Sequence, residues 1–104
     1  MTDNQLEQAV VAAGATAPRI TPADIEANII DTEIVKHVSK TGKVLRWAIL
    51  TTKNGYAVVG NPSVSVSIEN DRENIGNDIA ITNSKKELWP LMGYELASKL
   101  AIAK

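Results

Sequence analysis

The sequence predicts an α+β domain with two short N-terminal helices, a three- to four-stranded antiparallel β-meander and a long, kinked C-terminal helix. Three observations support this fold class. An Asn-Gly pair at 54–55 lies between two β-rich runs, a Thr-Pro pair at 21–22 opens a helix, and helically spaced apolar residues fill 75–103. A chain of 104 residues, 44% of them hydrophobic, suffices for one modest core. We therefore expect a single domain over residues 1–104.

Charge and composition exclude several classes of function. The formal net charge of -1 and a pI near 5.8 argue against a generic nucleic-acid or membrane-surface binder, which would be clearly basic. The lack of cysteine excludes a disulfide framework and thiol chemistry. No apolar run reaches the ~18 residues of a membrane span, and the N-terminal residues do not resemble a signal peptide. We expect a soluble cytoplasmic protein without a cofactor.

The first helix is predicted by a capping box. Thr2 and Gln5 have the Thr-x-x-Gln spacing in which each side chain satisfies a backbone donor. Leu6 and Val10 form a narrow apolar stripe, and Gly14 is placed to end the helix. This segment, residues 1–15, buries little, so it docks loosely, frays or serves as an oligomer contact.

The second helix has a more completely marked start. Thr21 is a good N-cap, Pro22 occupies the first helical position, and Asp24 lies three residues past the cap. Ile20 is placed to pack on Ile25 as a hydrophobic staple. The helix is expected to end near residue 30 or 31.

Two glycine-containing turns predict the pairing of the central strands. A two-residue turn at Asn54 and Gly55 pairs Thr51 with Val58. A two-residue turn at 41–42, after a strand at 33–39, pairs Val38 with Leu45 and Ile34 with Ile49. Both pairs lie on the same face of the sheet as Val58. The residues that this register predicts for the core face are Leu45, Trp47, Ile49, Tyr56 and Val58.

The last strand and the C-terminal helix follow from periodicity. Residues 63–68 alternate serine with aliphatic side chains, which predicts a short edge strand exposed on its serine side. The helix over 75–103 is expected to bury a face that includes Ile75, Ile79 and Trp89. Trp47 of the sheet is expected to be buried as well. Pro90 removes a backbone hydrogen bond, so the helix either kinks or splits near residues 86–90.

The chain resembles a family of small tailed-phage accessory proteins, the gene product 49/gene 66 family, over roughly residues 17–97. The residues that carry the resemblance are Ala17-Pro18-Arg19-Ile20-Thr21-Pro22, Thr52-Lys53-Asn54-Gly55-Tyr56, Gly60, Ser63, Asn70, Ile75-Gly76, Ile79-Ala80, Asn83 and Leu88-Trp89-Pro90-Leu91-x-Gly93-Tyr94 with Leu96. The function of this family is mostly recorded as unknown. The resemblance implies a phage protein acting in the cytoplasm of an infected bacterium.

This sequence also departs from the family pattern. It has Met92 where relatives usually have Glu, Ser65-Val66-Ser67-Ile68 where many have Cys-Val-Asp-Pro, and Lys85 where Arg is usual. These replacements weaken the inference that this chain has the same ligand site as its relatives.

We expect no enzymatic activity, no catalytic residue and no metal site. The one histidine, His37, falls on the face opposite the predicted core, as a surface side chain would. The acidic residues at 69, 71, 73 and 78 surround a helix start, where carboxylates favour the positive end of the helix dipole. No calcium loop and no phosphate loop is found in the sequence.

Binding is the better hypothesis, in two versions. In the first, which the family resemblance suggests, the protein sequesters a nucleotide-type immune signal of the host, as a counter-defence sponge. An aromatic ring would stack on the base, and cations or amides would bind phosphates. The candidate ligand-binding residues are Arg19, Tyr56, Asn70, Lys85 and Lys86. In the second, the protein binds a host or phage protein through its N-terminal helix or the edge strand at 63–68.

We further expect a homo-oligomer, most simply a dimer. The long helix covers one face of the meander, which leaves the apolar residues of the other face with only the short helices as cover. These residues are Val44, Ala48, Leu50, Ala57 and Val59. The alternative is that the first helix folds back and completes a monomer.

Overall fold

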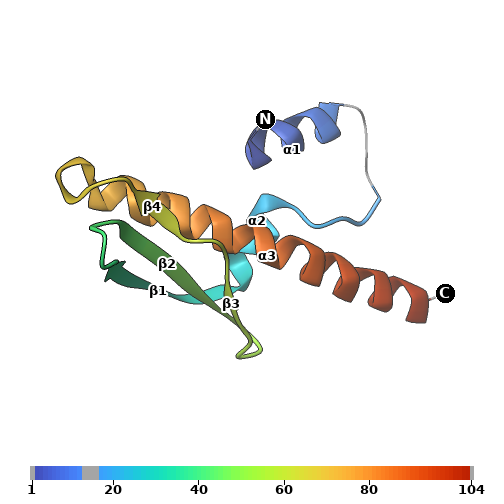
Figure 1. Cartoon of the computed structure of the whole chain (residues 1–104). Coiled ribbons are helices and arrows are strands. Elements are labelled where there is room, and N and C mark those ends of the chain that lie inside the picture. The colour runs from blue at the N-terminus through green and yellow to red at the C-terminus, as the bar shows by residue number, and fades with distance from the viewer. Residues whose placement is uncertain (1, 13–16, 104) are drawn as a thin grey trace.

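The computed structural model describes residues 2–12 and 17–103 and confirms the α+β class (Figure 1). A four-stranded antiparallel sheet packs against one long helix, with β1 and β3 on either side of β2, and β4 also pairing with β2. The elements are α1 (Asp3–Ala12), α2 (Pro22–Asn28), β1 (Ile29–Val38), β2 (Val44–Thr52), β3 (Ala57–Val59), β4 (Ser63–Ser65), a 3₁₀ turn (Ile68–Asn70) and α3 (Glu73–Ile102).

Both predicted N-terminal helix starts have the expected capping contacts. Thr2 N–H donates to Gln5 Oε1 at 2.8 Å, and Gln5 N–H donates to Thr2 Oγ1 at 3.1 Å. The same reciprocal pair joins Thr21 and Asp24 before α2. Within the described residues α1 ends at Ala12, and the predicted stop at Gly14 lies outside them. The capping residues were therefore sufficient to locate both helix starts from the sequence.

The predicted two-residue turns are wrong, because both hairpins have three-residue loops. Thr51 pairs with Ala57 rather than with Val58, and Val38 pairs with Val44. Each loop ends in a glycine with positive φ, 83° at Gly42 and 86° at Gly55, and no other described residue has positive φ. This geometry is a type I turn followed by a left-handed glycine. In the second loop Asn54 Oδ1 accepts from the backbone N–H of Tyr56 at 3.0 Å.

The change in register exchanges the two faces of β2. Successive residues of β2 alternate between buried and half-buried, and the even-numbered ones, Val44 to Thr52, lie under α3. Leu50 and Ala48 are fully buried, whereas the predicted core residues Leu45, Trp47 and Ile49 are half-buried on the other face. Val58 is buried opposite Leu50, and Tyr56 is exposed. A slip of one residue moves every side chain of a strand to the opposite face, which explains why these errors occur together.

The face of α3 that meets the sheet is made mainly of small side chains. Gly76, Ala80, Ser84 and Leu88, spaced four apart, are buried, while Ile75 and Ile79 are exposed, contrary to the prediction. Small residues let the helix approach β2 closely, which large apolar side chains would prevent. The expected split at Pro90 does not occur, because α3 is continuous through this residue. The kink stays a prediction.

Polar contacts tie α3 to the sheet at this close approach. Ser84 Oγ donates to the carbonyl oxygen of Ala48 at 2.6 Å and accepts from the backbone N–H of Gly60 at 2.9 Å. A Cβ on Gly60 would lie 2.3 Å from the carbonyl oxygen of Asn83. Only glycine therefore fits at this position without a backbone shift.

The sheet has two unlike sides. On one side the core residues Ile25, Leu50, Val58 and Leu88 pack together, and Ile20, Ile29, Trp89 and Met92 surround them. We name the opposite side the outer face; its residues are Glu33, Val35, His37, Leu45, Trp47, Ile49, Val59 and Val64. Figure 1 shows α3 along one side of the sheet and α1 beyond α3, away from the sheet. The outer face therefore has no covering helix among the described residues.

Two further predictions are corrected by this arrangement. The serine side of β4 is not exposed: Ser63 is buried and Val64 is 59% exposed, and the strand ends at Ser65. The apolar residues Val44, Ala48 and Leu50, predicted to lack cover, are buried under α3. The apolar surface left uncovered is instead the outer face.

Candidate functional site

The largest hollow lined by predicted ligand-binding residues lies where α1, α2 and α3 meet. It has a volume of about 430 Å³, and Lys85, Lys86 and Trp89 of α3 form one wall. Trp89 lies four residues after Lys85 and three after Lys86, so its ring is next to both lysines on the helix surface. The remaining lining residues are Thr2, Asp3, Asn4, Pro22, Ile25, Glu26 and Thr82.

A second hollow of about 310 Å³ adjoins the first, since Asp3 and Trp89 line both. Its other lining residues are Leu6, Glu7, Val10, Arg19 and Ile20. Together the two hollows have one aromatic ring, Trp89, with cationic side chains on two sides of it. Volumes of a few hundred Å³ lie in the range of small-molecule sites in proteins.

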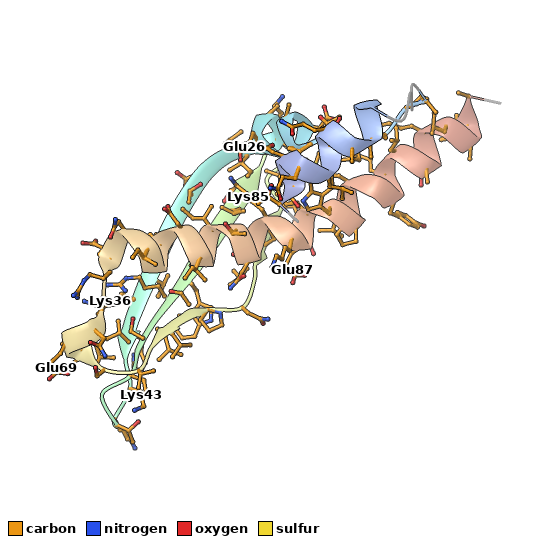
Figure 2. All side chains as sticks on the ribbon, turned by 90° about the horizontal axis from the view of Figure 1, so that it is seen from above. Glu26, Lys36, Lys43, Glu69, Lys85 and Glu87 are labelled. Atoms are coloured by element: carbon orange, nitrogen blue, oxygen red, sulfur yellow. The ribbon has the colours of Figure 1, made fainter. Side chains whose placement is uncertain are left out.

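Ion pairs fix part of this region. Lys85 Nζ binds Glu26 of α2, and Arg19 binds Glu7 of α1. Figure 2 shows Lys85 and Glu26 close together where α2 and α3 meet. Among the described residues Lys86 makes no ion pair, and the buried Arg19 Nε has no hydrogen-bond acceptor. An unpartnered buried donor costs free energy, so the Nε of Arg19 is a destabilising feature of this region.

The other two predicted residues lie elsewhere. Tyr56 is 59% exposed after the second hairpin loop, in a hollow of about 230 Å³ shared with Met92 and Glu95. Asn70, at the end of the 3₁₀ turn, lines a hollow of about 250 Å³ with Arg72 and Ile79. The structure thus brings Arg19, Lys85 and Lys86 around adjoining hollows and leaves Tyr56 and Asn70 outside them.

Trp89 and the pair formed by Arg46 and Asp71 are features that sequence reasoning missed. Trp89 packs against the core, as the sequence predicts, and it also lines the hollow, which its spacing from Lys85 and Lys86 could have indicated. Arg46 lies on the helix-facing side of β2, only 2% exposed, and donates to both oxygens of Asp71 at 2.5 and 2.7 Å. Sequence alone could not place this pair, because it depends on the register of β2.

Asp71 is an electrostatically perturbed group. Hydrogen bonds from Arg46 first, and from Ser65 second, lower the pKa of Asp71 to about 2, against the opposing effect of desolvation. The same hydrogen bond raises the pKa of Arg46. A Cβ on Gly76 would lie 2.9 Å from the Arg46 guanidinium, so this glycine makes room for the pair. The pair is oriented to hold the start of α3 against β2 and β4.

In the part of the chain that the structure describes, no group of three or more His, Cys, Asp or Glu side chains could hold a metal ion. None of the described helices is both long and apolar enough to cross a membrane.

The chain is a small two-layer α+β protein, with one long helix packed across one face of an antiparallel sheet. The chain matches the model of the phage protein (N4 Gp49/phage Sf6 gene 66) family over residues 20–100, and it belongs to this family. The match includes the α2 and α3 walls of the candidate site but not α1. No curated protein and no solved structure matches the chain.

Proposed function

We propose that this phage protein is a non-enzymatic binding protein that sequesters a nucleotide-type immune signal of the host. The observation that carries this proposal is the hollow lined by Trp89, Lys85 and Lys86, beside Arg19 in the adjoining hollow. An indole can stack on a base, and lysine and arginine can bind phosphates through charge-assisted hydrogen bonds. Tight binding without turnover would lower the concentration of the free signal in the infected cell.

The geometry supports a definite orientation of the ligand. The base lies on Trp89, and its phosphates reach Lys86, which makes no ion pair among the described residues. A phosphate that approaches Lys85 competes with Glu26, so binding exchanges one ion pair for another. Arg19 lines the smaller hollow, and its guanidinium attracts the negative charge of the ligand there in exchange for Glu7. Tyr56 and Asn70 have no contact with the ligand in this proposal.

Thermal unfolding with a panel of cyclic and linear nucleotides tests the proposal. A ligand at about one hundred times its Kd should add ~2.7 kcal/mol to the free energy of unfolding. Lys86→Ala should abolish the shift, because it removes the phosphate partner. Lys99→Ala is the matched control, since Lys99 is exposed on α3 outside both hollows. No shift with any nucleotide, or equal shifts for the two variants, contradicts the proposal.

Tryptophan fluorescence tests the stacking directly. The chain has two tryptophans, so a Trp47→Phe variant leaves Trp89 as the only indole. A nucleotide that stacks on Trp89 should quench its emission in a saturable way, with the same Kd as the thermal shift. Saturable stabilisation without quenching would place the ligand elsewhere.

The second candidate function is binding of a host or phage protein whose activity is thereby altered. The exposed valine of β4 favours it, since Val64 is 59% exposed on a short edge strand that does not carry a charge. A host-lysate pull-down separates the two functions when combined with the nucleotide panel. A specific partner that Val64→Lys releases, together with a flat panel, would favour the protein-binding function.

A further inference from the structure

The outer face is an apolar surface at the centre of the sheet. Val35, Val59 and Val64 are 41%, 49% and 59% exposed, and Trp47 lies half-buried between them. Antiparallel sheets with one face in water normally alternate apolar and polar side chains along each strand. From Trp47 to Leu50, β2 is instead apolar on both faces, as in strands that are buried on both sides. The outer face therefore has the composition of an interface.

We propose that the outer face binds a second copy of this chain, face to face, about a two-fold axis that passes through the row formed by Val35 and Trp47. This inference does not depend on the nucleotide proposal, because the outer face lies on the other side of the sheet from α3.

The arrangement of the outer face carries the proposal. Cross-strand pairing defines three rows across the sheet: Val35 and Trp47 form the central row. One flanking row is Glu33, Ile49 and Val59, and the other is His37, Leu45 and Val64. The two-fold axis runs across the strands, along the central row. A rotation of 180° about it places each flanking row of one copy over the other flanking row of the second copy. The outer face is self-complementary under this operation, as a two-fold interface requires.

The exchange matches side chains in chemistry and position. Ile49 of one copy lies over Leu45 of the other, and Val59 lies over Val64. Glu33 lies over His37, and an imidazole N–H can donate to a carboxylate. Trp47 lies near the axis, where interfaces concentrate their large aromatic residues. This matching of charge and residue type therefore favours a second copy over an unrelated partner.

The size of the outer face sets the expected affinity. The sheet is roughly 30 Å long, because β2 has nine residues with a rise of ~3.4 Å each. It is roughly 15 Å wide, because three strands lie side by side at ~4.8 Å. This footprint is smaller than the ~800 Å² that each partner buries in a standard interface. We therefore expect reversible association with a micromolar rather than a nanomolar dissociation constant.

Analytical ultracentrifugation of the full chain provides the first test. The mean mass should rise from the 11.2 kDa of the monomer towards the dimer as concentration increases through the micromolar range. Val35→Lys places a charge at the centre of the interface and should raise the dissociation constant at least about tenfold. Val66→Lys is the matched control, because Val66 is 73% exposed outside the outer face. Both variants should melt near the wild-type temperature at low concentration, where the monomer dominates.

Cross-linking tests the register of the two copies. The chain has no cysteine, so each introduced thiol is unique. A mixture of Val59→Cys and Val64→Cys chains treated with a short bis-maleimide should form mixed dimers. Val59→Cys alone should react less, because its two copies are offset by four residues, about 14 Å along the strands.

Three outcomes would overturn the proposal. One is a single species at the monomer mass at every concentration. Another is a dimer that Val35→Lys leaves intact. The third is efficient cross-linking of Tyr94→Cys, a residue of α3 that is 78% exposed, in place of the mixed dimers.

Discussion

The two faces of β2 have similar composition but different surroundings. The helix-facing side buries Val44, Ala48 and Leu50 against α3, whereas the outer face leaves Leu45, Trp47 and Ile49 partly in water. Hydrophobicity does not distinguish the two, because the outer face carries the larger side chains. The difference is close approach: the small residues of α3 fit against Ala48 and would form a poor surface for Trp47. Burial follows from packing geometry as much as from apolar area.

The largest expected effect is the loss of stability when a core residue of β2 is truncated, compared with truncation of its neighbour on the outer face. Leu50→Ala creates a cavity in the core and should lower the free energy of unfolding by about 2–5 kcal/mol. Each kcal/mol corresponds to roughly 4–8 °C in melting temperature for a domain of this size. Ile49→Ala, one residue away on the outer face, should cost clearly less when the protein is dilute. Equal losses in thermal melts would mean that both faces are covered in the monomer.

A glycine pair tests the close approach of α3. Gly60→Ala introduces a Cβ 2.3 Å from the carbonyl oxygen of Asn83, so the helix or the loop must shift, at a cost of about 1–3 kcal/mol. Gly93→Ala is the control within α3, since the added Cβ would have no atom within 4 Å apart from its chain neighbours and the adjacent helix backbone. It should stabilise the helix by up to ~1 kcal/mol. Urea unfolding of both variants checks this, and stabilisation by both would refute the tight contact.

The pH dependence of stability tests the ion pair on the helix-facing side. The pKa of Asp71 is about 2 in the folded protein, below its ordinary value of 3.8, so its contribution to stability is fully present above pH 4. That contribution should disappear as the pH falls from about 4 towards 2. Asp71→Asn should flatten this part of the profile in urea melts. A variant profile parallel to that of the wild type would show that Asp71 does not contribute.

The smallest expected effect concerns Ser65, which donates to Asp71 Oδ1 at 2.9 Å. Ser65→Ala removes the weaker of the two hydrogen-bond contributions that lower the pKa of Asp71. It should therefore reduce the acid dependence only partly, relative to Asp71→Asn. A reduction as large as that of Asp71→Asn would reverse the order of these contributions.

Local interactions made several elements predictable from the sequence. The caps at Thr2 and Thr21, the glycines at 42 and 55 and the apolar spacing of α3 each act within a few residues, so they can be seen without the fold. The α+β class follows from these elements, whereas the phage family was identified by the resemblance of its motifs. Among the residues that line the two hollows, Arg19, Lys85 and Lys86 are predictable from the sequence as ligand-binding candidates. Trp89 packs against the core, as the sequence predicts, and its second position in the walls of both hollows is visible only in the structure.

The tertiary structure decided which face of β2 is buried. A two-residue turn and a three-residue loop both use a left-handed glycine, so turn chemistry at Gly42 and Gly55 does not separate the two registers. The choice depends on contacts distant in sequence: Ser84 with Ala48, Gly60 with Asn83, and Arg46 with Asp71 across Gly76. These contacts exist only when α3 has packed on the sheet. The sequence by itself therefore determined the elements and their order, and long-range packing determined the register, the hollows and the outer face.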